Sequence, residues 1–293
     1  MNAVAESATA AGRVRPMKLL EKAVYRGPHL FSATPMIRLQ LDLGSLEAWP
    51  TDRLPDFPAR LLQALPSLVN HGCSLRRPGG FEQRLFEGTW LGHVAEHIAL
   101  ELQTLAGTPV TRGKTRSVRG RPGVYNVLFA YEHEEVGLRA GLHALRLVDS
   151  LLPEDLRGIS GLTVIDRSFA AADPFDLEAA LADLRQAIRA NSLGPTTNAL
   201  VSEARRRGIP VLRLDEHSLI QLGYGSRQKR LRASITGDTS QIAVDIAGDK
   251  NLTKQLLGDA GLPVPRGAVV RDAEAAVREA RRLRMPVVTK PLD

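Results

Sequence analysis

The pattern of apolar positions in the first half of the chain predicts an α+β domain. Alternating or continuous apolar residues predict two β-strands, at residues 36–43 and 124–131. Within residues 81–105, apolar side chains recur every three or four positions, as they do along the buried face of one long helix. The same periodicity over shorter stretches predicts helices at residues 58–68 and 134–152.

The second half of the chain predicts alternating helices and short strands, which is the pattern of an α/β region. Residues 153–161 begin with proline and include two glycines, so they form the predicted linker between the halves. Beyond this linker, helical periodicity predicts helices at residues 177–190, 198–207, 251–260 and 272–283. Short apolar runs predict strands at residues 210–214 and 286–290, and the glycines within 223–225 predict a turn.

These boundaries divide the chain into three parts. Residues 1–17 have small side chains but no apolar core of a secretory signal, so a disordered leader is predicted there. An N-terminal domain is expected over residues 18–155 and a second domain over residues 156–293, because 293 residues exceed the usual size of one domain. The last predicted strand ends close to residue 293, so we expect the second domain to be cut off.

Composition narrows the classes of protein to which the chain can belong. Its 43% hydrophobic and 24% charged residues are ordinary for a folded protein, and no apolar run is long enough to cross a membrane. Cys73 is the single cysteine, which excludes an internal disulfide framework and favours a cytoplasmic location. A metal site is therefore expected to use histidines and carboxylates as its ligands.

Two basic clusters account for much of the net charge of +7, at residues 112–121 (RGKTRSVRGR) and 227–232 (RQKRLR). Such clusters are either solvated surface or a face that binds phosphate or an acidic polymer. No nucleic-acid-binding motif accompanies them, so a nucleic-acid partner is not expected.

The clearest candidate chemistry lies in residues 91–100 (LGHVAEHIAL), within the predicted long helix. His93 and His97 are four residues apart, so both imidazoles can reach one Zn²⁺ from the same face. Glu96 lies beside them and can act as a general base. The order H-x-x-E-H is that of the inverzincin metalloproteases. The alternative is an ordinary solvated helix face, on which these three side chains have no common role.

A catalytic zinc needs a third protein ligand, and the sequence offers several carboxylates. Glu132, Glu134 and Glu135 lie at a predicted strand-to-helix junction. Glu101, one turn after His97 on the same helix, is a local competitor. The pattern alone does not choose among them.

Several blocks of sequence resemble known families. Residues 248–267 (GDKNLTKQLLGDAGLPVPRG) and 286–293 (PVVTKPLD) resemble the opening of an ATP-grasp fold. This resemblance implies that Lys250 and Lys290 contact ATP, where their ammonium groups would neutralise phosphate charge. Blocks from YRGPHLFS through GGFEQRLFEGTWLGHVAEH to TSQIAVDIAG resemble cyanophycin synthetases, over residues 18–293.

Cyanophycin synthetases combine an N-terminal domain, an ATP-grasp domain and a Mur-ligase-like domain. The resemblance implies a homo-oligomeric ligase that uses ATP and Mg²⁺ to extend a poly-aspartate backbone and to attach arginine to each aspartate. Its partners would be cyanophycin polymer, aspartate and arginine. In some members the N-terminal domain also has a metal-dependent site that cuts polymer into primers.

The resemblance assigns roles to individual residues of this chain. At the primer-generating site, His93, His97 and Glu134 would hold Zn²⁺ and Glu96 would be the base. In the segment SLGPTT, Ser192 and Thr196 would bind the growing polymer. Members often have LGPST where this chain has LGPTT, which keeps a hydroxyl but changes its geometry.

The predicted fold class is therefore α/β, with an α+β N-terminal domain followed by an incomplete ATP-grasp α/β domain. The glycine-rich loop over the ATP phosphates, the Mg²⁺ carboxylates and the arginine-adding domain are missing from the sequence, so we expect an incomplete ligase. Two other interpretations stay open. One is a stand-alone metallo-hydrolase or polymer-binding module of residues 18–152, and the other is a relative that joins preformed aspartyl-arginine dipeptides.

Overall fold

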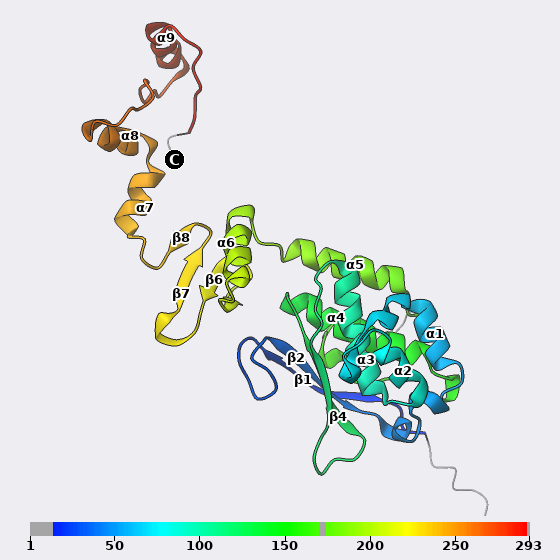
Figure 1. Ribbon diagram of the computed structural model, residues 1–293. Coiled ribbons are helices and arrows are strands. Elements are labelled where there is room, and N and C mark those ends of the chain that lie inside the picture. Colours follow the sequence, from blue (N-terminus) through cyan, green and yellow to red (C-terminus); the bar gives the residue numbers. More distant parts are fainter. Residues whose placement is uncertain (1–13, 170–173, 292–293) are drawn as a thin grey trace, which may run out of the picture. The chain divides into compact units, whose positions relative to one another are not determined.

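The computed structural model describes residues 14–169 and 174–291, which form two compact units that are treated separately here (Figure 1). The first unit ends at Ser192. Most of the expected leader lies outside the described residues. Its last residues are packed on the first unit, because Met17 is buried and the Arg15 amide donates to Ser45 Oγ at 2.9 Å.

The first unit is built on one antiparallel sheet with the strand order β1-β2-β4-β3. Its strands are β1 (Lys18–Tyr25), β2 (Met36–Asp42), β3 (Gly113–Ser117) and β4 (Val124–Ala130). The strands predicted at residues 36–43 and 124–131 are confirmed as the central pair β2 and β4. The outer strands β1 and β3 were not predicted.

The helices of the first unit are α1 (Phe57–Ala64), α2 (Gly80–Glu87), α3 (Leu91–Ala106), α4 (Glu134–Leu151) and α5 (Leu177–Ala190). The single helix predicted over residues 81–105 is wrong, because the chain breaks between α2 and α3. Gly88 has φ 103° there, and a Cβ at this position would lie 2.4 Å from Asp52 Oδ1. The helix predicted at residues 58–68 is also shorter, since Pro66 disfavours helical backbone at the residue before it.

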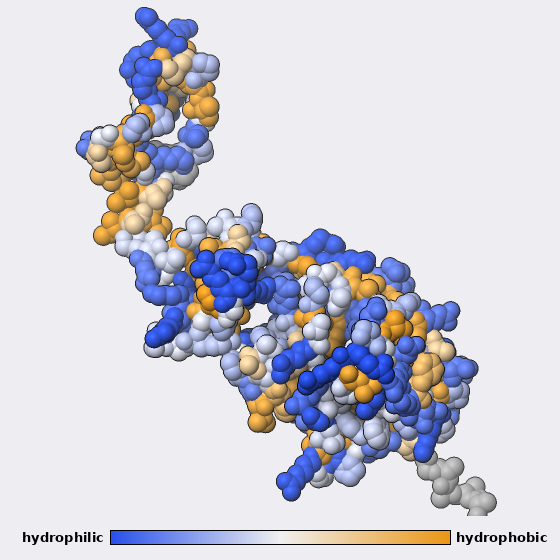
Figure 2. All heavy atoms as spheres, in the orientation of Figure 1, coloured by the Kyte–Doolittle hydropathy of each residue, from blue (hydrophilic) through white to orange (hydrophobic). Residues whose placement is uncertain are grey.

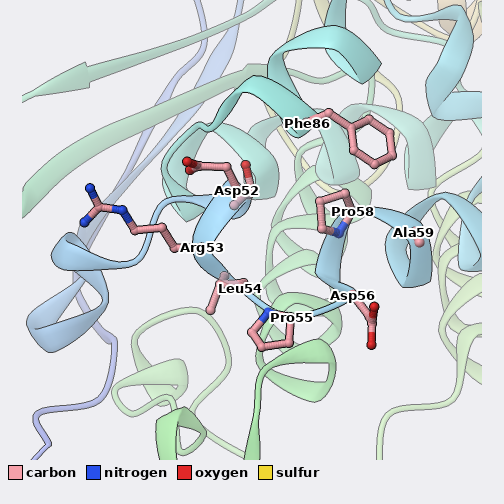
Figure 3. Close-up of a pocket in the computed structure, with 9 residues that line it drawn as sticks. Asp52, Arg53, Leu54, Pro55, Asp56, Pro58, Ala59 and Phe86 are labelled. Carbon is pink, nitrogen blue, oxygen red and sulfur yellow. The ribbon is translucent and has the colours of Figure 1, made fainter.

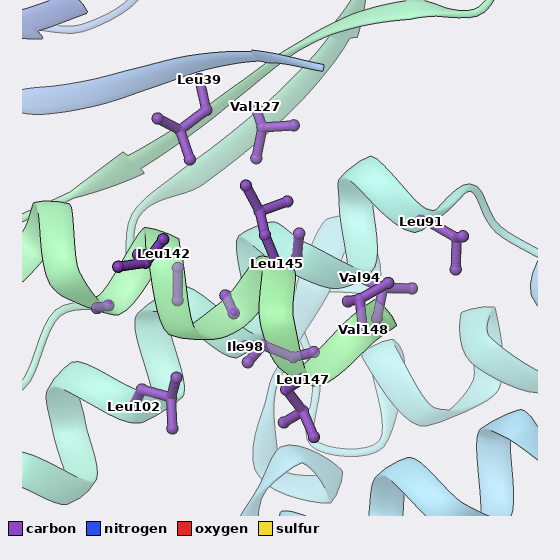
Figure 4. Close-up of a cluster of buried hydrophobic side chains, with 14 of the residues drawn as sticks. Leu39, Leu91, Val94, Ile98, Leu102, Val127, Leu142, Leu145, Leu147 and Val148 are labelled. Carbon is purple, nitrogen blue, oxygen red and sulfur yellow. The ribbon is translucent and has the colours of Figure 1, made fainter. Parts of the chain in front are cut away.

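The core of the first unit lies between the sheet and the helices α3 and α4 (Figure 4). Leu39 and Val127 point from the sheet toward Leu142 and Leu145 of α4, and all four side chains are buried. The buried side chains of α3 include Leu91, Val94, Ile98 and Leu102. This packing fixes the rotation of α3 about its axis, and therefore fixes where its histidines point.

Residues 153–161 do not form an open linker. The Leu19 amide donates to Ser160 O at 2.9 Å, which ties this segment to β1. Leu156 and Leu162 are buried in the main core, and α5 packs against α3 and α4. The first compact unit thus continues past the expected boundary at residue 155. Assignment of residues 156–293 to an ATP-grasp domain stays a prediction.

The second unit contains the helices α6 (Pro195–Arg206), α7 (Gln241–Gly248), α8 (Lys250–Asp259) and α9 (Ala273–Leu283). Its antiparallel sheet consists of β5 (Val211–Arg213), β6 (Leu219–Leu222), β7 (Lys229–Arg232) and β8 (Ile235–Thr236). Val201, Ile220 and Leu231 form its small core. Apolar side chains of α7 and α8 stay exposed, as the orange surface in Figure 2 shows.

The strand predicted at residues 286–290 is wrong. These residues have no strand partner among the described residues, and Val288 is 80% exposed. A segment forms a β-strand only when its backbone N–H and C=O groups make hydrogen bonds with a neighbouring strand. The mixed α/β class is confirmed, with two antiparallel sheets. None of the helices in residues 14–169 and 174–291 is long and apolar enough to cross a membrane.

Candidate metal centre

The helix α3 presents both histidines of the H-x-x-E-H motif on one face. It starts at Leu91 and ends at Ala106, and the following Gly107 has a φ of 112° that suits glycine. The rings of His93 and His97 lie with their centroids 4.8 Å apart. Phe81 of α2 stacks on His97 at 4.0 Å and meets His93 edge-on at 5.7 Å, so it holds both imidazoles in place.

Cys73 completes a group of three potential metal ligands. Its Sγ lies 3.2 Å from His93 Nε2, and the ligand atoms of Cys73, His93 and His97 all lie within 4.8 Å of one another. In tetrahedral zinc sites, bond lengths of about 2.3 Å to sulfur and 2.0 Å to nitrogen put neighbouring ligand atoms about 3.5 Å apart. One thiolate and two imidazoles suit zinc in chemistry as well as spacing. The converging set thus includes a cysteine, which the expectation of histidine and carboxylate ligands left out.

Each of the two histidines also has an outer partner, as zinc-binding histidines usually do. His93 Nδ1 lies 2.9 Å from Thr89 Oγ1, which leaves Nε2 for the ligand position beside Cys73. His97 Nδ1 lies 2.8 Å from His71 Nδ1. His71 Nε2 in turn lies 2.7 Å from Glu101 Oε2. These contacts fix the orientation of both rings.

The buried environment keeps both histidines neutral, which is the form that binds metals. Burial, with a smaller effect of the Arg84 charge, lowers the pKa of His93 to about 4. Burial also lowers the pKa of His97, and the neighbouring His93 and His71 add to this effect. Little competition from protons for the two imidazoles is therefore expected near neutral pH.

Glu96 points toward the sheet. It accepts a hydrogen bond from Thr115 Oγ1 of β3 at 2.6 Å. A Cβ at Gly113 would lie 2.3 Å from Glu96 Oε1, so glycine is what allows the carboxyl group to fit under β3. Burial raises the pKa of Glu96 to about 7, although Thr115 and the Arg116 charge act in the opposite direction.

Glu134 lies apart from this group. It begins α4 and forms a bidentate ion pair with Arg26, at 2.6 and 2.8 Å. Glu135 pairs with Arg139 at 2.7 Å, and Glu101 contacts His71. The set of ligand atoms that converge among the described residues contains none of these carboxylates. Sequence reasoning missed Cys73, which lies outside the H-x-x-E-H motif and reaches it only through the fold.

Of the other predicted site residues, Ser192 ends the first unit, and Thr196, Lys250 and Lys290 belong to the second. Lys250 is the first residue of α8, just after the helix-capping Asp249, and Lys290 is exposed. Ser192 Oγ donates to Ile188 O at 2.9 Å, while Thr196 lies in the first turn of α6. Their roles in nucleotide and polymer binding stay predictions.

A surface pocket of about 370 Å³ lies at the start of α1 (Figure 3). Asp52, Asp56 and Phe86 border it, and Figure 3 shows the two carboxylates at separate points of its rim. Its lining includes none of Cys73, His93 or His97. The candidate metal centre is therefore a separate site.

Comparison with known proteins places this domain in a family. Residues 38–153 match the family model described as the cyanophycin synthase-like N-terminal domain. The chain is 42% identical to the cyanophycin synthetase of Geminocystis herdmanii (strain PCC 6308) over 281 residues, which are 94% of this chain and 30% of that protein. It is 41% identical to the cyanophycin synthetase of Trichormus variabilis (strain ATCC 29413 / PCC 7937) over 282 residues, or 94% of this chain and 29% of that protein. The chain thus spans about 30% of the length of these curated relatives, and its residues 38–153 form a cyanophycin synthase-like N-terminal domain.

Proposed function

We propose that the first unit carries a zinc-dependent hydrolase site that cuts cyanophycin polymer into primers. The observation that supports this most strongly is the convergence of Cys73, His93 and His97 within 4.8 Å. An ordinary solvated helix face does not bring a buried and a half-buried histidine against a cysteine, or give each histidine an outer partner. This geometry favours Cys73 over Glu134 as the third ligand.

The chemistry follows from the properties of the neighbouring groups. A zinc ion at this site would supply Lewis acidity toward a peptide carbonyl and a water molecule. Glu96 takes the proton of the attacking water and returns it to the leaving amine, for which a pKa of about 7 is well suited. The hydrogen bond from Thr115 orients the Glu96 carboxylate.

The ligase assignment concerns the whole protein and rests on similarity to the curated relatives. We propose that the protein is an ATP- and Mg²⁺-dependent amide ligase that adds aspartate and arginine to cyanophycin. Lys250 and Lys290 would contact ATP, and Ser192 and Thr196 would contact the polymer. Labelling by a photoreactive ATP analogue tests this: Lys250→Ala and Lys290→Ala should each reduce it. Undiminished labelling of both variants would remove their assigned role.

The hydrolase proposal is tested by incubating the zinc-loaded protein with arginyl-poly-aspartate in the absence of ATP. Chain length is followed by gel electrophoresis. Wild type should produce shorter chains, and Glu96→Gln should cut about 10²–10⁴-fold more slowly. Glu134→Gln is the matched control, because its carboxylate pairs with Arg26, and it should cut like wild type. If wild type leaves the polymer intact, the hydrolase proposal fails. If Glu96→Gln cuts at the wild-type rate, Glu96 is not the base.

A further inference from the structure

The strand β3 has a free edge. At the two ends of the β3–β4 pairing, Ala130 N donates a hydrogen bond to Arg112 O and Val118 N donates one to Val124 O, both at 2.8 Å. In an antiparallel ladder the main-chain groups of alternate residues face opposite ways. Those of Gly113, Thr115 and Ser117 therefore point away from β4. No strand lies on that side among the residues that the structure describes, because β3 ends the strand order.

The face of α3 that extends beyond this edge carries the two histidines of the candidate metal centre. Gly92 lies against β4 and the adjoining side of β3, since a Cβ there would lie 3.3 Å from Val127 Cγ2 and 3.6 Å from Thr115 Cγ2, and Glu96 reaches β3. At about 100° per residue, Glu96 lies about 40° around the helix from Gly92, His93 about 100° and His97 about 140°. The order around the helix is thus β4, then β3, then the two histidines. A further strand, about 4.8 Å beyond β3, would run along the side of α3 that carries the histidines, where His93 is half-buried and His97 is covered by Phe81.

We propose that β3 is the docking strand for an extended peptide with negatively charged groups, which adds to its free edge and so runs across the metal centre. This inference rests on the proposed hydrolase function and adds how its substrate is held. Main-chain hydrogen bonds from Gly113, Thr115 and Ser117 would supply much of the affinity, independently of the side chains of the peptide.

The charges around β3 favour a peptide that carries carboxylate groups. Lys114 and Arg116 are exposed and lie on the sheet face opposite α3, two residues apart, so they match every second residue of an extended chain. In a poly-aspartate whose arginines are joined through their amino groups, each arginine keeps a free carboxylate that such cations can bind. The same cations disfavour the other occupant of an open edge, β3 of a second copy, because like charges would then face each other.

Amide hydrogen exchange of the full chain, followed by NMR, tests the docking directly. The zinc-free protein is mixed with an arginyl-poly-aspartate oligomer. The amides of Thr115 and Ser117 should exchange rapidly in the free protein and at least about tenfold more slowly with saturating oligomer. Those of Lys114 and Arg116 are already bonded to β4 and should change little. Absence of added protection at Thr115 and Ser117 overturns the proposal, and so does protection that rises with protein concentration alone, which would mean pairing of two copies.

A pair of variants at Ser117 gives an independent check. Proline removes the outward N–H but no bond to β4, so Ser117→Pro should weaken oligomer binding about tenfold. Ser117→Ala keeps the N–H and should bind within about twofold of wild type. Wild-type affinity of a folded Ser117→Pro variant contradicts docking on this edge. Zinc content and polymer cleavage are measured separately. Cleavage without added protection of the Thr115 and Ser117 amides by the oligomer refutes the docking alone. Protection of these amides without cleavage refutes the hydrolase function.

Discussion

Removing the charge of Glu96 should stabilise the metal-free protein at high pH. Burial raises the pKa of this carboxyl from its usual 4.5 to about 7 in the folded chain. The folded protein binds the proton more tightly than the unfolded chain, so protonation of Glu96 adds to the free energy of unfolding. This added stability is fully present below pH 4.5 and is lost as the pH rises through about 7. At 1.36 kcal/mol for each pH unit between the two values, the loss is about 3 kcal/mol. Glu96→Gln keeps the shape of the protonated side chain and should escape this loss.

The assay is urea unfolding in the presence of a chelator, at pH values from 5 to 8.5. Trp49 and Trp90, the two tryptophans of the chain, both lie in the first unit, so their fluorescence reports its unfolding. The free energy of unfolding of Glu96→Gln should exceed that of wild type by about 3 kcal/mol at pH 8.5, and by less than about 1 kcal/mol at pH 5.

Glu101 supplies a matched control with the opposite sign. Burial would raise the pKa of Glu101, but hydrogen bonds with His71 and Ser67 and the charge of His71 together lower it. Its stabilising effect is therefore present above the usual pKa of a glutamate and is lost as the pH falls. Glu101→Gln should be less stable than wild type at neutral pH, with a deficit that shrinks toward acid. If the free energies of unfolding of wild type and Glu96→Gln change with pH in parallel, the reasoning about Glu96 is refuted.

Further substitutions test the packing of the first unit and the charges on β3. Gly113→Ala should cost about 1–3 kcal/mol in the free energy of unfolding, because its Cβ meets the Glu96 carboxyl at 2.3 Å; wild-type stability in urea would show that Glu96 is not under β3. Leu145→Ala should cost about 2–5 kcal/mol, whereas the exposed Leu105→Ala should cost less than about 1 kcal/mol; equal losses would contradict the assigned core. Lys114→Ala combined with Arg116→Ala should weaken oligomer binding and make it less dependent on salt, which a titration at two ionic strengths measures; an unchanged salt dependence would remove these cations from the interface.

Sequence periodicity predicted the central strands and the helix that carries the histidines, because these elements bury one continuous apolar face. It did not predict β3, whose sequence GKTRS is polar. The face of β3 that points toward α3 contacts the polar side chain of Glu96, to which Thr115 donates a hydrogen bond. The strand therefore does not need alternating apolar residues. In β1 an irregular register between Leu19 and Glu21 breaks the alternation that would have identified it.

The candidate site was predicted only in the part that is local in sequence. Helical spacing is sufficient to place His93 beside His97. The convergence of Cys73 depends on how the segment before α2 folds back onto α3, including the bond from Phe81 N to His71 O at 3.0 Å, and no local pattern specifies such a contact. Glu134 was chosen by resemblance, and the structure shows it engaged by Arg26, which lies far from it in sequence.

The central claim is that Cys73, His93 and His97 hold one zinc ion. Elemental analysis of purified protein, after dialysis against trace zinc, measures it most directly. The account predicts about one zinc per wild-type or Glu134→Gln chain, and almost none for His93→Ala or Cys73→Ala with both variants folded. Equal zinc in wild type and His93→Ala would contradict the site, and loss of zinc from Glu134→Gln with full retention in Cys73→Ala would show that the glutamate is the third ligand.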